Sequence, residues 1–303
     1  MARIRLAAGI VFGLLLLVAT RAQSDGVKQI APGVYFWQGD ADKREPANCT
    51  WIVFKDYVLV IDANYPWGTR EIMPKIKSTT SKPIRFLFDT HWHSDHTFGN
   101  SLYADAGATI VCSQDCADEL RTRGPAAWSS YNGTGEYSLQ NYRLEQATLT
   151  FPDKMAFDDG NERVEITHMG PGHTKGDAVA YLPKEKILVT GDLCVNWNRG
   201  NNVADSSADP ENWVRVLDQL AKWDIKTVVP GHGGVGDLDT LRQQREYLAD
   251  MVSQVRAGIQ AGKTADQVAS GIDLSKHGTF GANAQANSNS ARAVYRKLSA
   301  ARN

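Results

Sequence analysis

The sequence has little cysteine and almost no net charge. Its 303 residues include four cysteines, Cys49, Cys112, Cys116 and Cys194, and no Cys-x-x-Cys pair. A chain of this size does not need disulfides for stability, so Cys49 and Cys112 are expected to be small buried side chains. The 33 basic and 34 acidic residues nearly cancel, to a formal charge of -1. This balance gives no reason to expect nucleic acid or an anionic membrane as a partner.

A long apolar run is also missing, except at the N-terminus. Arg3 and Arg5 precede the apolar residues 6–19, and Thr20 and Ala22 place small side chains where a signal peptidase cleaves. The alternative is a membrane anchor, but this run is shorter than the roughly 20 residues that span a bilayer. We therefore expect cleavage after Ala22, a periplasmic or secreted protein, and no membrane association once the signal is removed.

Strand-like runs alternate with helical patterns along the rest of the chain. The predicted strands cover residues 34–37, 49–54, 57–61, 84–88, 108–111, 148–151, 164–168, 178–182, 187–190 and 227–229. The predicted helices cover residues 69–77, 114–123, 238–259 and 291–301, with further helices starting at Pro210 and after the capping box of Thr264 and Gln267. Two blocks of strands, each broken by helices, predict an α/β fold in which two mixed sheets pack together with helices outside.

Two segments rich in small and polar residues are expected to be loops. Residues 124–142 are predicted to form a long surface loop, or a lid, and residues 279–290 a second loop. No linker is long enough to separate two large domains. The predicted division is a signal peptide at residues 1–22, one α/β domain at residues 23–262, and a C-terminal helical extension at residues 263–303.

One short motif carries most of the chemistry. His91, His93, Asp95 and His96 all lie in Thr-His-Trp-His-Ser-Asp-His, directly after the apolar strand predicted at residues 84–88. Histidine and aspartate are costly to bury without partners, so this is not a core pattern. In an extended backbone His91 and His93 point to the same side. The following turn brings Asp95 and His96 to a second point, which suits two adjacent metal ions better than one.

Three more candidate ligands follow strands further along the chain. They are His173 in Gly-Pro-Gly-His-Thr, Asp192 in Thr-Gly-Asp and His232 in Pro-Gly-His-Gly. In each case glycine allows a tight turn where a strand ends, and strand ends of one sheet converge in space. The two remaining histidines stand apart from these motifs. His168 is expected to be a structural strand residue and His277 a surface residue.

The donor types indicate the metal. Five imidazoles and two carboxylates favour zinc, whereas a di-iron site would be favoured if a glutamate replaced His93. A carboxylate can span two ions, so Asp192 is the natural bridge. Two zinc ions about 3.5–4 Å apart lower the pKa of a shared water and polarise a carbonyl. The sequence therefore predicts two zinc ions per chain and a hydrolase acting on a small-molecule substrate.

The four motifs resemble the metallo-β-lactamase superfamily in order and spacing, from about Ile30 to about Val252. The resemblance implies an αββα sandwich with the metals in a cleft at one edge of the two sheets. It also implies one zinc ion on three histidines and a second on Asp95 and two histidines, with Asp192 shared. By this resemblance the first ion would be held by His91, His93 and His173, and the second by Asp95, His96 and His232. Asp95 would also orient the bridging hydroxide, and Asp62, after the strand at 57–61, would support the ligands from behind.

This chain departs from the best-known β-lactamase subclass at two positions. That subclass has a metal-binding cysteine where Asp192 stands, and three residues later a lysine that binds the substrate carboxylate, here Val195. Cys194 is expected to point away from the metals. Asn196 and Arg199 are the candidates for anchoring an anionic substrate. The aspartate bridge is closer to the thioesterase and lactonase branches, including glyoxalase II-like enzymes.

Three functions follow from these observations. The first is an exported, β-lactamase-like zinc hydrolase that uses a zinc-bound hydroxide to attack an amide or ester carbonyl, and export favours it. The second is a lactonase or thioesterase, which the Asp192 bridge favours, although glutathione thioesters are cytosolic. The third is a non-catalytic metal-binding protein, which the complete ligand set disfavours. The sequence carries no signal for the oligomeric state.

Overall fold

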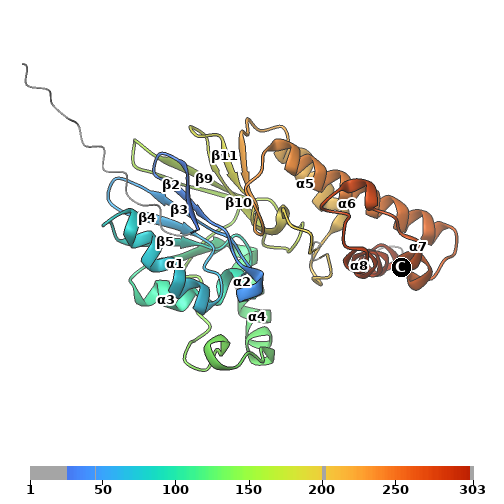
Figure 1. The fold of residues 1–303 in the computed structure, drawn as a ribbon, viewed down its shortest axis with the longest axis horizontal. Coiled ribbons are helices and arrows are strands. Elements are labelled where there is room, and N and C mark those ends of the chain that lie inside the picture. The colour runs from blue at the N-terminus through green and yellow to red at the C-terminus, as the bar shows by residue number, and fades with distance from the viewer. Residues whose placement is uncertain (1–25, 45, 200–202, 301–303) are drawn as a thin grey trace, which may run out of the picture.

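The computed structural model describes residues 26–44, 46–199 and 203–300. The predicted signal peptide lies outside these residues. Two β-sheets face each other and helices cover both outer faces, as the ribbon in Figure 1 shows. The αββα sandwich expected from the sequence is therefore confirmed. Across the described residues, the helices are all too short or too polar to cross a membrane.

The first sheet has seven strands in chain order. They are β1 (Val27–Ala31), β2 (Val34–Trp37), β3 (Cys49–Val53), β4 (Val58–Ile61), β5 (Ile84–Phe88), β6 (Thr109–Ser113) and β7 (Leu149–Phe151). The pairs from β1 to β4 are antiparallel, and those from β4 to β7 are parallel. The carboxyl ends of β4 and β5 therefore lie side by side at one edge of the sheet.

The second sheet has five strands in the order β12-β11-β10-β9-β8. They are β8 (Lys154–Asp158), β9 (Arg163–His168), β10 (Ala178–Leu182), β11 (Ile187–Val189) and β12 (Thr227–Val229). Only β11 and β12 pair in parallel, so their carboxyl ends also lie together.

The helices divide between the two outer faces. They are α1 (Pro66–Thr79), α2 (Ser94–Thr97), α3 (Asn100–Asp105), α4 (Gln114–Ser130), α5 (Pro210–Leu220), α6 (Leu238–Gln260), α7 (Ala265–Gly271) and α8 (Ala284–Ala300). In Figure 1, α1, α3 and α4 lie beside the first sheet, whereas α5 to α8 extend from the second sheet to the right.

Three apolar clusters match these layers. Phe36, Ile61 and Phe88 of the first sheet meet Ile166 and Val229 of the second in the cluster between the sheets. A second cluster joins the outer face of the first sheet to α1 and α3. The third joins β10 and β11 to the helices from α5 to α8. Burial of both faces of each sheet fixes the strand ends that position the site.

Two of the predicted loops contain helix instead. Helix α4 continues to Ser130, so the first part of the loop expected at residues 124–142 is wrong. Gly124 and Pro125 are poor helix formers, but Gly124 fits closely between Leu120 and Leu144, since a Cβ there would lie 3.1 Å from each. Tertiary packing outweighs local propensity here. The rest of this segment includes a 3-10 turn at Gly135–Tyr137.

The loop predicted at residues 279–290 is wrong from Ala284 onward, where α8 begins. Among its small and polar residues, Gly281, Asn287 and Ser290 are buried. Tyr247 of α6 donates to Asn287 Oδ1 at 3.0 Å, and Asn287 Nδ2 donates to the Gly281 carbonyl at 2.9 Å. The prediction that His277 is a surface residue is also wrong, because its side chain is only 9% exposed and its Nε2 donates to Asp250 at 2.9 Å.

Two strands, β1 and β8, were not evident in the sequence. Both are edge strands of their sheets and carry mostly exposed or half-buried side chains. Their sequences, Val-Lys-Gln-Ile-Ala and Lys-Met-Ala-Phe-Asp, therefore lack the apolar run that marked the central strands. The division at residue 262 stays a prediction; α7 and α8 share one apolar cluster with α5 and α6.

Candidate metal centre

The structure brings all seven predicted ligands together. Their donor atoms form two groups, and within each group all the donors lie within 4.8 Å of one another. The first group consists of His91, His93, His173 and Asp192, and the second of Asp95, His96 and His232. These are the two sets that the family resemblance implied.

The segments that follow strand ends at one edge of the two sheets place these side chains. His91 and His93 follow β5, and Asp95 and His96 lie in the short helix α2 just beyond it. In the second sheet, His173 lies in the loop between β9 and β10. Asp192 lies in the 3-10 turn Gly191–Leu193 after β11, and His232 follows β12. Since β11 and β12 are parallel neighbours, their ends deliver Asp192 and His232 to the same point.

The Asp192 carboxylate faces both groups. Its Oδ2 lies 3.4 Å from His173 Nε2 and 4.0 Å from His91 Nε2. Its Oδ1 lies 3.1 Å from His232 Nε2 and 3.4 Å from His96 Nε2. One carboxylate thus offers a separate oxygen to each group, which is the arrangement of a bridging ligand.

Ring nitrogens converge within each group. His93 Nδ1 is 2.9 Å from His173 Nε2 in the first, and His96 Nε2 is 3.4 Å from His232 Nε2 in the second. Asp95 Oδ2 completes the second group, 3.4 Å from His232 Nε2. His91 Nε2 is buried without any hydrogen-bond partner. Such crowding of acceptor-type nitrogens fits a shared cation.

Outward hydrogen bonds fix which nitrogen points inward. His96 Nδ1 donates to Asp62 Oδ2 at 2.9 Å, so its Nε2 is left for the centre. Thr90 Oγ1 lies 3.0 Å from His91 Nδ1 and donates to Asp62 Oδ2 at 3.0 Å. Asp62 therefore orients two imidazoles, directly and through Thr90, in the supporting role that the resemblance implied.

The other two oriented histidines use different acceptors. His232 Nδ1 donates to the Pro46 carbonyl at 2.7 Å, and His93 Nε2 donates to Asp205 Oδ2 at 2.8 Å. His173 is the exception, since its buried Nδ1 has no hydrogen-bond partner. Four of the five histidines thus present a lone pair inward. Imidazole and carboxylate donors in this number fit two zinc ions better than magnesium or calcium, which prefer oxygen.

The histidine pKa values of the two groups are shifted in opposite directions. Burial and the nearby histidines lower the pKa of His173 to about 3 and hold that of His91 well below its usual value. Burial would also lower the pKa of His96, but the carboxylates of Asp62 and Asp192 raise it well above the ordinary value. The pKa of His232 is raised for the same reason, by the carboxylates of Asp192 and Asp95. A proton and a cation therefore compete for the nitrogens of the second group.

Two glycines make room for the centre. Gly191 has φ of +52°, and a Cβ there would come within 2.4 Å of Thr90 Oγ1. A Cβ on Gly231 would lie 2.0 Å from Asp192 Oδ1. Only glycine allows these turns to bring Asp192 between the two groups.

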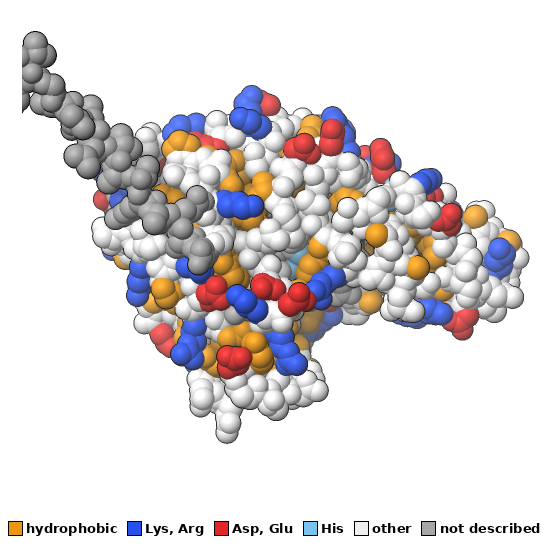
Figure 2. Space-filling model, in the orientation of Figure 1, with side chains coloured by type: hydrophobic (Ala, Val, Ile, Leu, Met, Phe, Trp, Pro, Cys, Tyr) orange, Lys and Arg blue, Asp and Glu red, His pale blue; other side chains and the backbone are white. Residues whose placement is uncertain are grey.

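Members of both groups border a cavity of about 440 Å³. Figure 2 shows a hollow near the middle of this face with histidine visible inside it. His93, Asp95, Asp192 and His232 border it, together with Pro46, Val195, Trp197, Arg199, Val203, Ala204, Ala286, Asn289 and Ser290. The cavity is thus lined by charged ligands on one side and largely by small or apolar side chains on the other.

The two candidate substrate anchors take different positions. Arg199 borders the cavity but is half exposed, and its Nη2 donates to Asp42 Oδ1 at 2.6 Å. Asn196 is not among the cavity residues, because its Nδ2 donates to the Gly234 carbonyl at 2.9 Å and fixes the loop after His232. Its neighbour Trp197 does border the cavity, stacked on the His232 ring with 4.2 Å between centroids.

Cys194 lies away from the centre. It is fully buried in the apolar cluster with Trp213 and Leu217, and neither group of candidate ligands among the described residues includes it. The backbone forms a 3-10 turn at residues 191–193, not the strand extension assumed from the sequence, yet the side chain still points into the core.

His168 ends β9 and its Nε2 donates to the Lys175 carbonyl at 3.1 Å, a structural role.

Neither Asp205 nor Trp197 was predicted from the sequence to belong to the site. Asp205 stands in Ala-Asp-Ser-Ser-Ala-Asp, which has no preceding strand and no ligand spacing, although its carboxylate reaches His93. The segment resembles any solvated loop. Its role depends on contacts with residues more than 80 positions away, which no local pattern records.

The arrangement of motifs and sheets agrees with comparisons to known proteins. A family model described as the metallo-beta-lactamase superfamily matches residues 42–232, more than half of the chain. The chain belongs to the metallo-β-lactamase superfamily. The matched residues include all seven candidate ligands, whereas α6, α7 and α8 lie beyond them.

Individual members of the superfamily are only distantly similar. The metallo-beta-lactamase IND-1 of Chryseobacterium indologenes is 26% identical over 199 residues, which cover 63% of this chain and 73% of that protein. A linear primary-alkylsulfatase of a Pseudomonas species is 23% identical, over 69% of this chain and 46% of that protein. A metallo-beta-lactamase from Pontibacter korlensis has the same fold, with a TM-score of 0.60 and 24% identity, covering 74% of this chain and 98% of that one.

Proposed function

We propose that the protein is an exported zinc-dependent hydrolase that cleaves a carbonyl bond of a small amide or ester, with β-lactam-like substrates as the first class. The observation that supports this most is the Asp192 carboxylate, which offers one oxygen to each ligand group. Two bridged zinc ions supply Lewis acidity toward a carbonyl and make a water acidic enough to act as a nucleophile near neutral pH. The proposed holders are His91, His93, His173 and Asp192 for the first ion and Asp95, His96, His232 and Asp192 for the second.

Asp95 is the proposed catalytic residue of this chain. Its side chain is 20% exposed, and it borders the cavity with Oδ2 beside His232 Nε2. With Oδ2 facing the second ligand group, Oδ1 is the oxygen that would accept a hydrogen bond from the attacking water and take its proton. The other ligands are all more deeply buried, and His93 comes next with a side chain 14% exposed. Asp95 is therefore the carboxylate best placed to orient a nucleophile toward a bound substrate.

The apolar side of the cavity would bind the body of the substrate. Trp197 offers a flat ring fixed by stacking on His232, and Val195 and Val203 lie nearby. Arg199 is the single cationic side chain among the cavity residues named above, and we propose that it meets an anionic group of the substrate at the rim. Binding there would require Arg199 to exchange its partner Asp42, which is itself exposed.

A lactonase or thioesterase is the second candidate function. The bridging residue is aspartate, and Val195 borders the cavity three residues after it, so no lysine stands there to bind a carboxylate. A substrate without a carboxylate would not need a lysine at this position, so its binding would not be weakened by Val195. One of the similar proteins is named as a linear primary-alkylsulfatase, which supports keeping an ester among the candidate substrates.

A comparison of three substrates on one protein preparation tests which type of bond the protein cleaves. Zinc-loaded protein is assayed with nitrocefin, an acyl homoserine lactone and an acyl thioester, and kcat/KM is measured for each. Asp192→Ala protein serves as the blank for contaminating activity. A highest value on nitrocefin supports the β-lactamase-like proposal, whereas a highest value on the lactone or thioester supports the second. No turnover of any of them, by protein shown to hold zinc, would favour a binding role.

Export is proposed from residues 1–22 alone. Expression of the full chain in a bacterial host, followed by fractionation and N-terminal sequencing, tests it. A mature N-terminus at Gln23 in the periplasm or medium agrees with the proposal. Retention of the uncleaved chain in the cytoplasm contradicts it.

A further inference from the structure

Asp205 reaches the first ligand group from a loop beyond the second sheet. Its side chain is only 3% exposed, and its Oδ2 accepts from His93 Nε2 at 2.8 Å. This contact decides the orientation of the His93 ring, because it commits Nε2 and leaves Nδ1 facing His173. A buried carboxylate holds such a position only if other groups compensate its charge.

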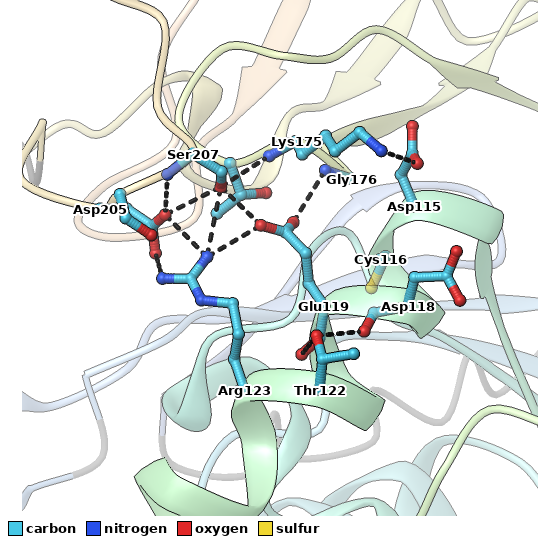
Figure 3. A network of polar contacts seen from close by, with 12 residues as sticks. Asp115, Cys116, Asp118, Glu119, Thr122, Arg123, Lys175, Gly176, Asp205 and Ser207 are labelled. Carbon is cyan, nitrogen blue, oxygen red and sulfur yellow. Dashed lines mark hydrogen bonds and ion pairs between the residues drawn. The ribbon is translucent and has the colours of Figure 1, made fainter. Parts of the chain in front are cut away.

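Arg123 of α4 supplies that compensation. Its Nη1 and Nη2 donate to Asp205 Oδ1 and Oδ2 at 2.9 and 2.8 Å, a two-pronged contact drawn in Figure 3. Charge-assisted pairs of this form are strong and directional. The guanidinium also lies over the Trp92 ring, 4.2 Å from its centroid, and Trp92 separates His91 from His93 in the sequence. Arg123 therefore contacts both Asp205 and the side chain of Trp92, the residue before His93.

Glu119, one turn earlier on α4, connects this contact to the loop that carries His173. Its Oε1 accepts from Arg123 Nη1 at 2.8 Å, and its Oε2 accepts from the Gly176 backbone N–H at 3.0 Å. Figure 3 shows Glu119 between Arg123 and Gly176, with Ser207 on the same network. One helix thus ties together the loops that position two ligands of the first group.

The C-terminal helix fixes Asp205 from the other side. Lys297 of α8 donates through Nζ to the Asp205 carbonyl at 2.6 Å and to the Ser206 carbonyl at 3.3 Å. The same helix contributes Ala286 and Asn289 to the cavity wall. The family match ends at residue 232, so α8 lies outside the matched residues and still contacts the loop that carries Asp205.

We propose that Arg123 and Lys297 are positioning residues that clamp Asp205 against His93, so that α8 is a working part of the metal centre. The inference rests on the proposed function, because it assumes that His93 binds a metal. Arg123 holds the carboxylate of Asp205 and Lys297 holds its backbone. Loss of either contact leaves Asp205 free to move and the His93 ring without a fixed orientation. Outer partners of this kind change metal affinity by about 10–100-fold.

The test measures metal binding, not activity. Zinc is titrated into metal-free protein against a chelating dye, and two stepwise dissociation constants are fitted for wild type, Arg123→Met, Lys297→Met, Asp205→Ala and Asp205→Asn. Arg121→Met and Arg292→Met are the controls. They remove a cation from α4 and from α8, where Arg121 pairs with Asp118 and Arg292 with Asp266, away from the site. Thermal unfolding of each metal-free protein is recorded in parallel.

The clamp predicts that one dissociation constant weakens by about tenfold in Arg123→Met and Lys297→Met, and the other by less than about twofold. Asp205→Ala should weaken the same constant at least as much, and Asp205→Asn should recover part of the loss because its Oδ1 still accepts from His93. The two controls should match wild type. If Arg123→Met does not fold, Lys297→Met and the Asp205 pair decide the question.

Two results would overturn the inference. In the first, Lys297→Met and Arg123→Met unfold at a lower temperature than wild type but bind both ions with wild-type affinity. The contacts would then only stabilise the loop that carries Asp205. That result leaves the proposed zinc hydrolase intact. In the second, wild-type protein binds no zinc, and both the clamp and the proposed function fail together.

Discussion

The two oxygens of Asp192 face different histidines, with Oδ1 3.1 Å from His232 Nε2 and Oδ2 3.4 Å from His173 Nε2. The two histidines come from different loops of the second sheet, and Asp192 comes from a third. A single carboxylate therefore connects the two candidate metal positions. Removing it leaves two like charges with less screening between them.

Asp192→Ala is therefore expected to lower the affinity for the second zinc ion and to abolish most activity. Cys194→Ser is the matched control, since Cys194 is two residues away and buried in the apolar core. It should leave zinc affinity unchanged and cost some stability, because a hydroxyl is buried where a thiol packed well. Zinc titration and initial rates on one substrate compare the two. Loss of zinc by Cys194→Ser alone would mean that the bridge has been assigned to the wrong residue.

Asp95→Asn is expected to reduce turnover by at least about a hundredfold while folding is little changed. The amide keeps the shape of the side chain, but it no longer accepts a proton or supplies negative charge to the second ion. Because Asp95 is the most exposed of the carboxylate ligands, its loss should affect the reaction more than stability. The measurements are kcat and the thermal unfolding midpoint. Near-normal kcat in a zinc-loaded variant would rule out the proposed role.

Asp62→Asn tests whether the hydrogen bonds that Asp62 accepts from His96 and Thr90 contribute to zinc binding. Asp62 orients His96 directly and His91 through Thr90, and its backbone has φ of +63°, which asparagine tolerates and alanine does not. The variant should bind zinc about tenfold more weakly with little change in backbone stability. Asp56→Asn, an exposed aspartate in the turn before β4, is the control. Equal zinc affinity in Asp62→Asn and wild type would show that its hydrogen bonds do not matter to the site.

Gly231→Ala tests the space that Asp192 occupies. The new Cβ would lie 2.0 Å from Asp192 Oδ1, so the carboxylate must move. We expect zinc affinity to fall about tenfold or more, as for other changes that misplace a ligand. Gly234→Ala, three residues on, is the matched control because nothing lies closer than 3.9 Å to its added Cβ. If both variants bind zinc as wild type does, Asp192 is not held where the structure places it.

The central strands and the ligand motifs could be predicted because their signals are local. The strands at Ile84–Phe88 and Ala178–Leu182 are apolar runs bounded by polar turns, and the structure has them with the same limits. His91 and Asp192 follow strands of the two facing sheets, so the packing of the sheets brings them to one edge. Spacing separated His91 and His93 from Asp95 and His96, and the family resemblance assigned His173 and His232 to the two groups.

The features that were missed depend on distant packing. Asp205 becomes part of the site only because Arg123 and Lys297 approach it from α4 and α8. Asn287 makes α8 start early because Tyr247 of α6 hydrogen-bonds to it inside the core, where the sequence showed only a polar stretch. Asn196 carries a plausible anchoring group, yet a carbonyl of the neighbouring loop takes up its amide. None of these contacts has a counterpart in local periodicity.

The most direct test of the whole account is the zinc content of the purified chain. Protein is dialysed against zinc, freed of excess metal, and analysed for metal and protein in the same sample, before and after treatment with a chelator. The account predicts two zinc ions per chain, loss of activity when they are removed, and recovery when zinc is returned. Fewer than one zinc ion per chain, with activity unaffected by the chelator, would contradict it.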